Sequence, residues 1–154
     1  MARISAKEKE EKQKKYDEVV FNIFITEGWD AISYGRIAKE VGVTASSLQN
    51  YYPRLVDFGR ALQGRVFPMV AHQLDFSSKE TFVSSWDVAI QSGGLFPSLI
   101  RMLIQSALET ETSPQTVQGI IRLKGVLAQN MSLEDADSAI KSALGTTIIT
   151  LMNQ

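Results

Sequence analysis

The chain has 154 residues, of which 44% are hydrophobic and 21% are charged, a composition typical of a folded globular protein. It contains no cysteine and a single histidine, His72, which excludes disulfide scaffolds, thiol nucleophiles and Cys-based metal sites, so we expect neither a metal nor a cofactor. Sixteen basic and seventeen acidic residues give a net charge of −1, so the total charge gives no sign of a nucleic-acid partner.

Neither export nor insertion into a membrane is expected. The first fifteen residues are charged and contain no apolar stretch of the kind found in a secretory signal. No uncharged run is longer than 13 residues, the length of residues 88–100 and of residues 142–154, which is too short for a bilayer span. We therefore expect a cytoplasmic protein with no membrane partner.

A long first helix is predicted near the start of the chain. Apolar side chains recur at helical spacing between Tyr16 and Phe24, which predicts a helix from about residue 6 to Glu27, ended by Gly28 in the left-handed conformation. Residues 1–15 carry six basic side chains, Arg3 among them, and three acidic ones, a net charge of +3. This basic start offers phosphate or minor-groove contacts, but its pattern is equally typical of a solvated helix end with i,i+4 pairs.

Two short helices are expected next. Ser33 is placed to cap a helix that ends near Val41, and Gly42 follows directly. Thr44 is placed to cap another helix over residues 45–51. The pair therefore has the length and spacing of two helices joined by a tight turn.

The remaining chain is also predicted to be helical. Capping serines, glycine breaks and a proline at a first helical position predict four helices, over residues 77–92 with a Ser77/Glu80 capping box, over 95–111, from Pro114 after the Ser113 cap, and from Ser132 nearly to the end. No alternating strand pattern and no hairpin signal is present in the sequence. The fold class is therefore all-α.

Residues 34–51 match the positional demands of a helix-turn-helix. Ala38 is the small residue that a close helix crossing needs, and Gly42 is the residue that a turn with positive φ needs. Positions that must be apolar to hold the pair on a supporting helix are all apolar: Ile37, Val41, Val43, Leu48 and Tyr51. The alternative, an ordinary helical hairpin in a core, explains the agreement less well.

At this point the sequence resembles the TetR family of bacterial transcriptional regulators, over about residues 16–61. Residues 27–33 look like that family's joint after the first helix, residues 37–43 like its second helix and turn, and residues 48–53 like its recognition helix and exit. Leu55 stands where the family often has a phosphate-binding lysine, with Arg54 next to it. The resemblance implies a homodimeric repressor that binds DNA through its N-terminal domain and is released by a small-molecule effector.

A recognition helix in the major groove presents its outward residues to base edges. Because Leu48 faces inward, the positions expected at the bases are Ala45, Ser46, Gln49 and Asn50. The positions expected at phosphates are Thr44, Ser47, Tyr51 and Arg54. One short helix reads too few base pairs to select a site, so two subunits on a pseudo-palindromic operator of double-stranded DNA are expected.

The predicted domains are a helix-turn-helix DNA-binding domain, 1–56, and a helical dimerisation and ligand-binding domain, 57–154. Homodimerisation is expected through residues 114–153, where two apolar stripes favour a four-helix bundle: Val117, Ile120, Ile121, Leu127 and Ala128, then Ala136, Ile140, Ala143, Leu144, Thr147, Ile148 and Leu151. Packing of these stripes within one chain is the alternative.

An effector pocket in the second domain is the remaining expectation. Candidate lining residues are His72, Phe82, Trp86, Phe96, Met102 and Gln105, although such an aromatic and Met stripe is more often plain core. No nucleophile or acid–base constellation is visible in the sequence, so no enzyme is expected. The alternative function is a helical protein-interaction adaptor with a vestigial DNA-binding domain.

Overall fold

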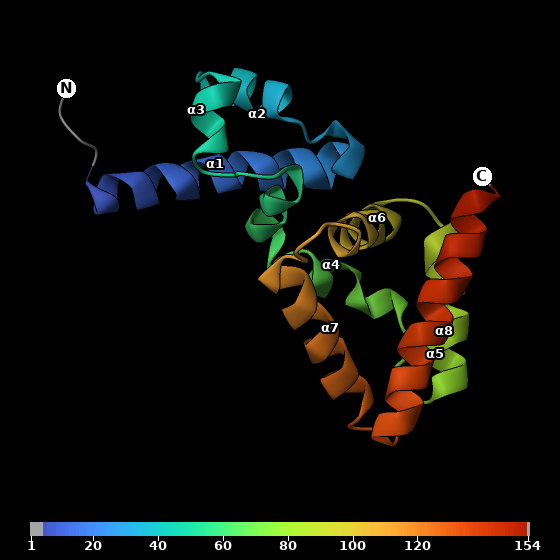
Figure 1. The fold of residues 1–154 in the computed structure, drawn as a ribbon. Coiled ribbons are helices and arrows are strands. Elements are labelled where there is room, and N and C mark those ends of the chain that lie inside the picture. The colour runs from blue at the N-terminus through green and yellow to red at the C-terminus, as the bar shows by residue number, and fades with distance from the viewer. Residues whose placement is uncertain (1–4, 154) are drawn as a thin grey trace. The chain divides into compact units, whose positions relative to one another are not determined.

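The computed structural model describes residues 5–153, and these are helical with no strand among them, which confirms the all-α expectation (Figure 1). Arg3 lies outside the described residues. The chain divides into two compact units, Met1–Arg65 and Val66–Gln154. Within residues 5–153, no helix combines the length and the apolarity needed to cross a bilayer.

The first unit is built on one long helix. Its elements are α1 (Ala6–Glu27), the 3-10 turn η1 (Trp29–Ala31), α2 (Tyr34–Val41), α3 (Ala45–Gln49) and the 3-10 segment η2 (Leu55–Leu62). The Ser5 hydroxyl accepts a hydrogen bond from the Glu8 backbone N–H at 3.1 Å and caps α1. Gly28 ends α1 with φ 89° and ψ 176°, a positive φ that favours glycine but not the left-handed helical conformation that the sequence predicted.

Two tyrosines lock the short helices onto α1. Tyr52 is fully buried and stacks on Phe58, with ring centroids 4.4 Å apart. Its hydroxyl donates to the Asp17 carboxylate on α1, and the Tyr34 hydroxyl donates to the Tyr52 carbonyl. Burial, with the negative charge of Asp17, raises the pKa of Tyr52 far above its ordinary value, so the phenol stays a proton donor.

The segment η2 was not predicted. It packs against α1 and buries the side chains of Val56, Phe58 and Leu62. Residues 57–65 therefore belong to the first compact unit, whereas the sequence placed the domain boundary after residue 56. These residues join the first unit because the apolar side chains of η2 pack against the buried side of α1.

The second unit consists of α4 (Phe67–Val70), the 3-10 turn η3 (Ala71–Gln73), α5 (Lys79–Gln91), α6 (Leu95–Ala107), α7 (Pro114–Leu127) and α8 (Leu133–Met152). Its most extensive helix contact is between α5 and α8. Phe82, Trp86 and Phe96 form an aromatic chain in the core, in which the Trp86 and Phe96 rings meet edge-on at 4.9 Å. The indole N–H of Trp86 donates to the buried Thr147 hydroxyl at 2.6 Å, so α5 and α8 are joined by a polar bond as well.

Several helix limits differ from those predicted. The cap of α5 is Ser78, which exchanges hydrogen bonds with Thr81, because the Ser77 hydroxyl is held by the Asp75 carboxylate. The expected Ser77/Glu80 capping box is therefore wrong by one residue.

Two helices also end earlier than predicted. The third helix ends at Gln49, two residues before the predicted end at residue 51, and its last backbone bonds tighten into a turn. Helix α6 ends at Ala107, because the buried Ser106 hydroxyl lies 3.1 Å from the Ser113 hydroxyl and accepts from the Thr116 hydroxyl at 2.9 Å. These bonds tie the end of α6 to the start of α7.

Candidate nucleic-acid interface

The turn between α2 and α3 has the geometry that a helix-turn-helix requires. The Ser33 hydroxyl accepts from the Arg36 backbone N–H at 3.1 Å and starts α2. Gly42 ends it in the left-handed conformation, with φ 75° and ψ 34°. The N–H groups of Gly42 and Val43 both donate to the Ala38 carbonyl, at 2.9 and 3.0 Å, so the turn itself satisfies this carbonyl in the last turn of α2.

Helix α3 is attached through one side and open on the other. Leu48 is fully buried and is the only buried residue of this helix. The four predicted base-facing residues, Ala45, Ser46, Gln49 and Asn50, are all exposed. The outward face therefore presents a hydroxyl, two carboxamides and a methyl group, which are groups that read base edges in a major groove.

The residues predicted at phosphates are held in different ways. Thr44 is exposed and its hydroxyl accepts from the Ser47 N–H at 3.0 Å, so it caps α3. The Tyr51 ring meets the Tyr16 ring of α1 edge-on at 5.0 Å, and the Gln13 amide donates to the Tyr51 carbonyl at 3.5 Å. Ser47 and Tyr51 are both half-buried beside the exposed face.

Arg54 is engaged by a neighbour of its own. Its guanidinium lies 3.2 Å from the Asp57 carboxylate, and the same carboxylate accepts from the Arg54 backbone N–H at 2.7 Å. The residue therefore starts η2, and its cation is partly neutralised before any phosphate approaches.

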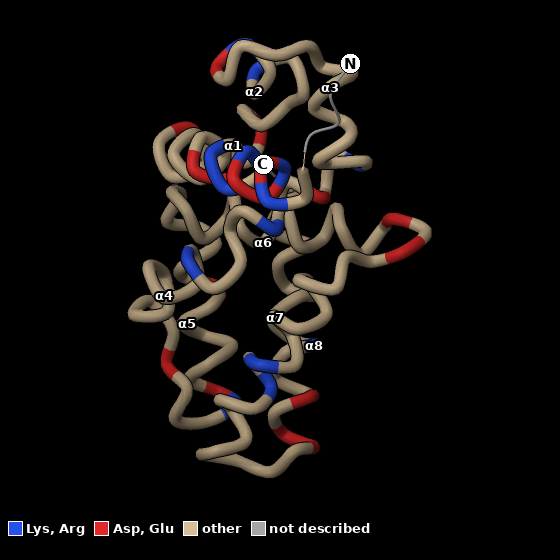
Figure 2. Tube along the Cα trace, turned by 90° about the vertical axis from the view of Figure 1, so that its left-hand side faces the viewer, with Lys and Arg blue, Asp and Glu red and all other residues tan. Residues whose placement is uncertain are grey.

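Charge is absent from the stretch that carries α3. No Asp, Glu, Lys or Arg occurs from residue 41 to residue 53, and Figure 2 shows the trace of α3 free of charged positions. The nearest upstream arginine, Arg36, is held between Glu27 at 2.6 Å and Glu40 at 3.1 Å. The guanidinium lowers the pKa of Glu27 below its ordinary value, and the three charges together sum to −1, so this group offers no excess cation to DNA.

Lys9 belongs to the basic start noted in the sequence, but its position beside Tyr51 was not predicted. The Lys9 ammonium lies 5.5 Å from the centroid of the Tyr51 ring, within the range of a cation–π interaction. Lys9 is 42 residues from Tyr51 in the chain. The sequence did contain one sign of this contact. Lys9 and Tyr16 are seven residues apart and so lie on the same side of α1.

The six candidate effector residues divide into three groups. Phe82, Trp86 and Phe96 are buried in the core of the second unit, with at most 2% of their surface exposed. His72 is exposed on η3, and the remaining two, Met102 and Gln105, are half-buried on α6. The structure brings the three aromatic side chains into ring contact, and their role toward an effector stays a prediction.

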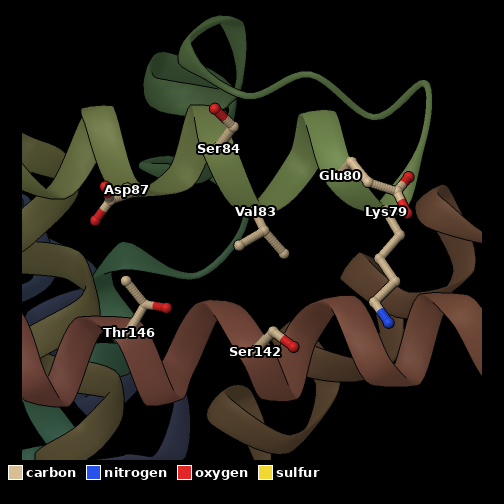
Figure 3. Close-up of a pocket in the computed structure, with 7 residues that line it drawn as sticks. All are labelled: Lys79, Glu80, Val83, Ser84, Asp87, Ser142 and Thr146. Atoms are coloured by element: carbon tan, nitrogen blue, oxygen red, sulfur yellow. The ribbon is translucent and has the colours of Figure 1, made fainter.

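A groove of about 420 Å³ lies elsewhere, between α5 and α8 (Figure 3). Figure 3 shows Val83 directed toward α8, with Ser142 and Thr146 of α8 facing α5. The full lining is Lys79, Glu80, Val83, Ser84, Asp87, Ser142 and Thr146, which includes none of the six candidates.

The stripes predicted for subunit contact are partly buried inside the chain. On α7 and α8 the buried members are Leu127, Ala136, Ile140, Ala143 and Thr147. The assignment of whole stripes to an interface between subunits is therefore wrong, because α8 uses this side to pack against α5. The large apolar side chains that stay exposed on α7 and α8 are Val117, Ile121, Val126, Leu133, Ile148, Ile149 and Met152.

Comparison with known proteins identifies the second unit. The family model described as the tetracycline repressor LuxT C-terminal domain matches residues 63–151, more than half of the chain. No curated protein matched the sequence. The match lies outside the helix-turn-helix that carried the resemblance, so the two observations come from separate parts of the chain. Together they establish that the chain belongs to the TetR family of transcriptional regulators, with a C-terminal domain of the LuxT type.

Proposed function

We propose that the protein is a homodimeric transcriptional repressor that binds a pseudo-palindromic operator and is released by a small-molecule effector. The observation that carries the proposal is the orientation of α3, in which Leu48 alone is buried and Ala45, Ser46, Gln49 and Asn50 are exposed. A five-residue helix with no packing role on its outer face is free to enter a major groove.

The side chains on and beside α3 are proposed to make two kinds of contact with the operator, to bases and to phosphates. The carboxamides of Gln49 and Asn50 each have the donor and acceptor that pair with the major-groove edge of adenine, and the Ala45 methyl fits against a thymine methyl. Ser46 is proposed at the bases with these residues, and the proposed phosphate contacts are Thr44, Ser47, Tyr51 and Arg54. Such contacts fix the register of the helix on the duplex without reading sequence.

The proposed dimer contact uses the exposed apolar side chains of α7 and α8. Gly145, Ile148, Ile149 and Met152 recur at helical spacing on α8 and are exposed, and no charged residue follows Lys141 in the sequence. A contiguous uncharged helix end of this kind favours a self-complementary contact about a two-fold axis. Val117 and Ile121, four residues apart on α7, would add to the buried area.

Release by an effector is supported by membership of the family alone. The residues proposed to respond to it remain His72, Phe82, Trp86, Phe96, Met102 and Gln105. Because the aromatic members hold α5 in the core, an effector that displaced them would shift α5 and α8 together.

The test is a selection from a random duplex pool, followed by fluorescence anisotropy on the enriched sequence across a salt series. A regulator should enrich one palindrome and lose affinity steeply as salt rises. Sedimentation at the same protein concentration should give the mass of two chains on one palindrome. Failure to enrich any sequence, with a flat salt profile, would contradict the proposal and favour the interaction adaptor.

A further inference from the structure

The start of α1 carries lysines close to α3. DNA attracts proteins largely through phosphate neutralisation, yet residues 41–53 contain no cation. Among residues 5–65, each arginine is in an ion pair: Arg36 with Glu27 and Glu40, Arg54 with Asp57, Arg60 with Asp17, and Arg65 with Glu18. The cations without an ion pair in that range are all lysines: Lys7, Lys9, Lys12, Lys15 and Lys39.

Two of these lysines lie on the side of α1 that faces α3. Lys9 continues the stripe of Gln13 and Tyr16, since residues four and seven positions apart share one side of a helix. Lys12 lies about 60° from Lys9 around the helix axis, at about 100° per residue. Glu10 and Glu11 lie about 100° or more from both lysines, whereas Glu8 lies about 100° from Lys9 and about 40° from Lys12.

The contacts place this stripe beside the exposed face of α3. The Lys9 ammonium lies 5.5 Å from the Tyr51 ring centroid, and the Gln13 amide donates to the Tyr51 carbonyl. Figure 1 shows the first turns of α1 extending past α3. Lys9 and Lys12 are both exposed, so their ammonium groups can reach a phosphate chain that α3 approaches.

We infer that Lys9 and Lys12 form a phosphate-binding stripe on α1 that extends the DNA-reading surface beyond α3. This inference rests on the proposed function, because it assumes that α3 meets a duplex. The stripe supplies the cations that α3 lacks, and Tyr51 holds Lys9 at the junction between the two helices. Acidic and basic residues are mixed along residues 5–15, and of the three glutamates only Glu8 lies on the side of Lys12.

The test compares two double variants that remove the same charge from opposite sides of α1. Lys9→Gln with Lys12→Gln removes the stripe, whereas Lys7→Gln with Lys14→Gln removes two lysines that lie about 140–160° from Lys9. Glutamine has a helix propensity close to that of lysine, so α1 should stay helical, and circular dichroism checks this for both variants.

The readout is the slope of log K against log salt concentration on the selected duplex and on an unrelated duplex. The Lys9/Lys12 variant should reduce the magnitude of this negative slope by about 1 per lysine on both duplexes. The Lys7/Lys14 variant should change the slope by much less. Equal slopes for the two variants, or a stripe variant that behaves like the wild type, would overturn the inference while leaving the proposed function intact. A wild-type protein that binds no duplex would overturn both.

Discussion

Helices α3 and α8 show how differently the two units use apolar and polar faces. Helix α3 buries a single side chain, Leu48, and exposes Ser46 and Gln49, whereas α8 buries five residues along one side. The difference follows from what each helix packs against. Helix α3 packs chiefly against the short helix α2, while α8 lies along α5 and is joined to it by the Trp86–Thr147 hydrogen bond. A helix with few internal contacts keeps an outer face that is open to a partner, whereas a helix that holds a core keeps many contacts.

The largest effect is expected from Trp86→Ala, which tests how strongly α8 is held in the core of the second unit. The change removes a fully buried indole and leaves the Thr147 hydroxyl without its donor. We expect the free energy of unfolding of the second unit to fall by about 3–5 kcal/mol, as for other large-to-small changes in cores. Urea unfolding followed by circular dichroism measures it. Val88→Ala, at a position that is 64% exposed on the same helix, should change stability by no more than about 0.5 kcal/mol.

The second prediction concerns the exposed side of α8. Ile149→Glu places a carboxylate at a position that is 60% exposed in the single chain. If two copies meet there, self-association should weaken by about tenfold or more, because an unpaired carboxylate is costly to bury. Sedimentation velocity over a concentration series gives the dissociation constant. An unchanged mass with Ile149→Glu would place the subunit contact elsewhere on the molecule.

The third prediction separates base reading from phosphate binding in the first unit. Gln49→Ala should relax the preference at one base pair and cost about 1–3 kcal/mol on the selected operator. Arg54→Ala should weaken all duplexes alike, and by less than a free cation would, because Asp57 already pairs with it. Anisotropy on the operator and on single-base variants distinguishes them. The same pattern of loss for both variants would contradict these roles.

The smallest effect is expected from Thr44→Ala, which removes the cap of α3. The lost hydrogen bond to the Ser47 N–H should cost about 1 kcal/mol of stability in the first unit, while Thr44→Ser should retain most of it. Thermal unfolding of the three proteins gives the difference. Thr44→Ser should bind DNA like the wild type, and Thr44→Ala should bind every sequence more weakly. That result would show that the hydroxyl stabilises α3 and contacts phosphate and does not read bases.

The helix-turn-helix could be predicted because its determinants are local. Ser33 and Thr44 bond to N–H groups three residues later, and Gly42 adopts a positive φ that its own lack of a side chain permits. Such interactions depend on neighbours within one helical turn, so the spacing of residues in the sequence already contains them. The same reasoning placed the starts of α7 and α8 at the residues that follow Ser113 and Ser132.

The sequence by itself thus determined the longer helices, the caps Ser33, Thr44, Ser113 and Ser132, and the outward face of α3. Only the tertiary structure decided what each apolar stripe packs against: α8 turns Ala143 and Thr147 toward α5, and η2 covers α1. It also decided that Lys9 lies over Tyr51, 42 residues away in the chain. The physical reason is that periodicity tells which side of a helix is apolar, but the partner of that side is chosen by contacts between residues far apart in sequence.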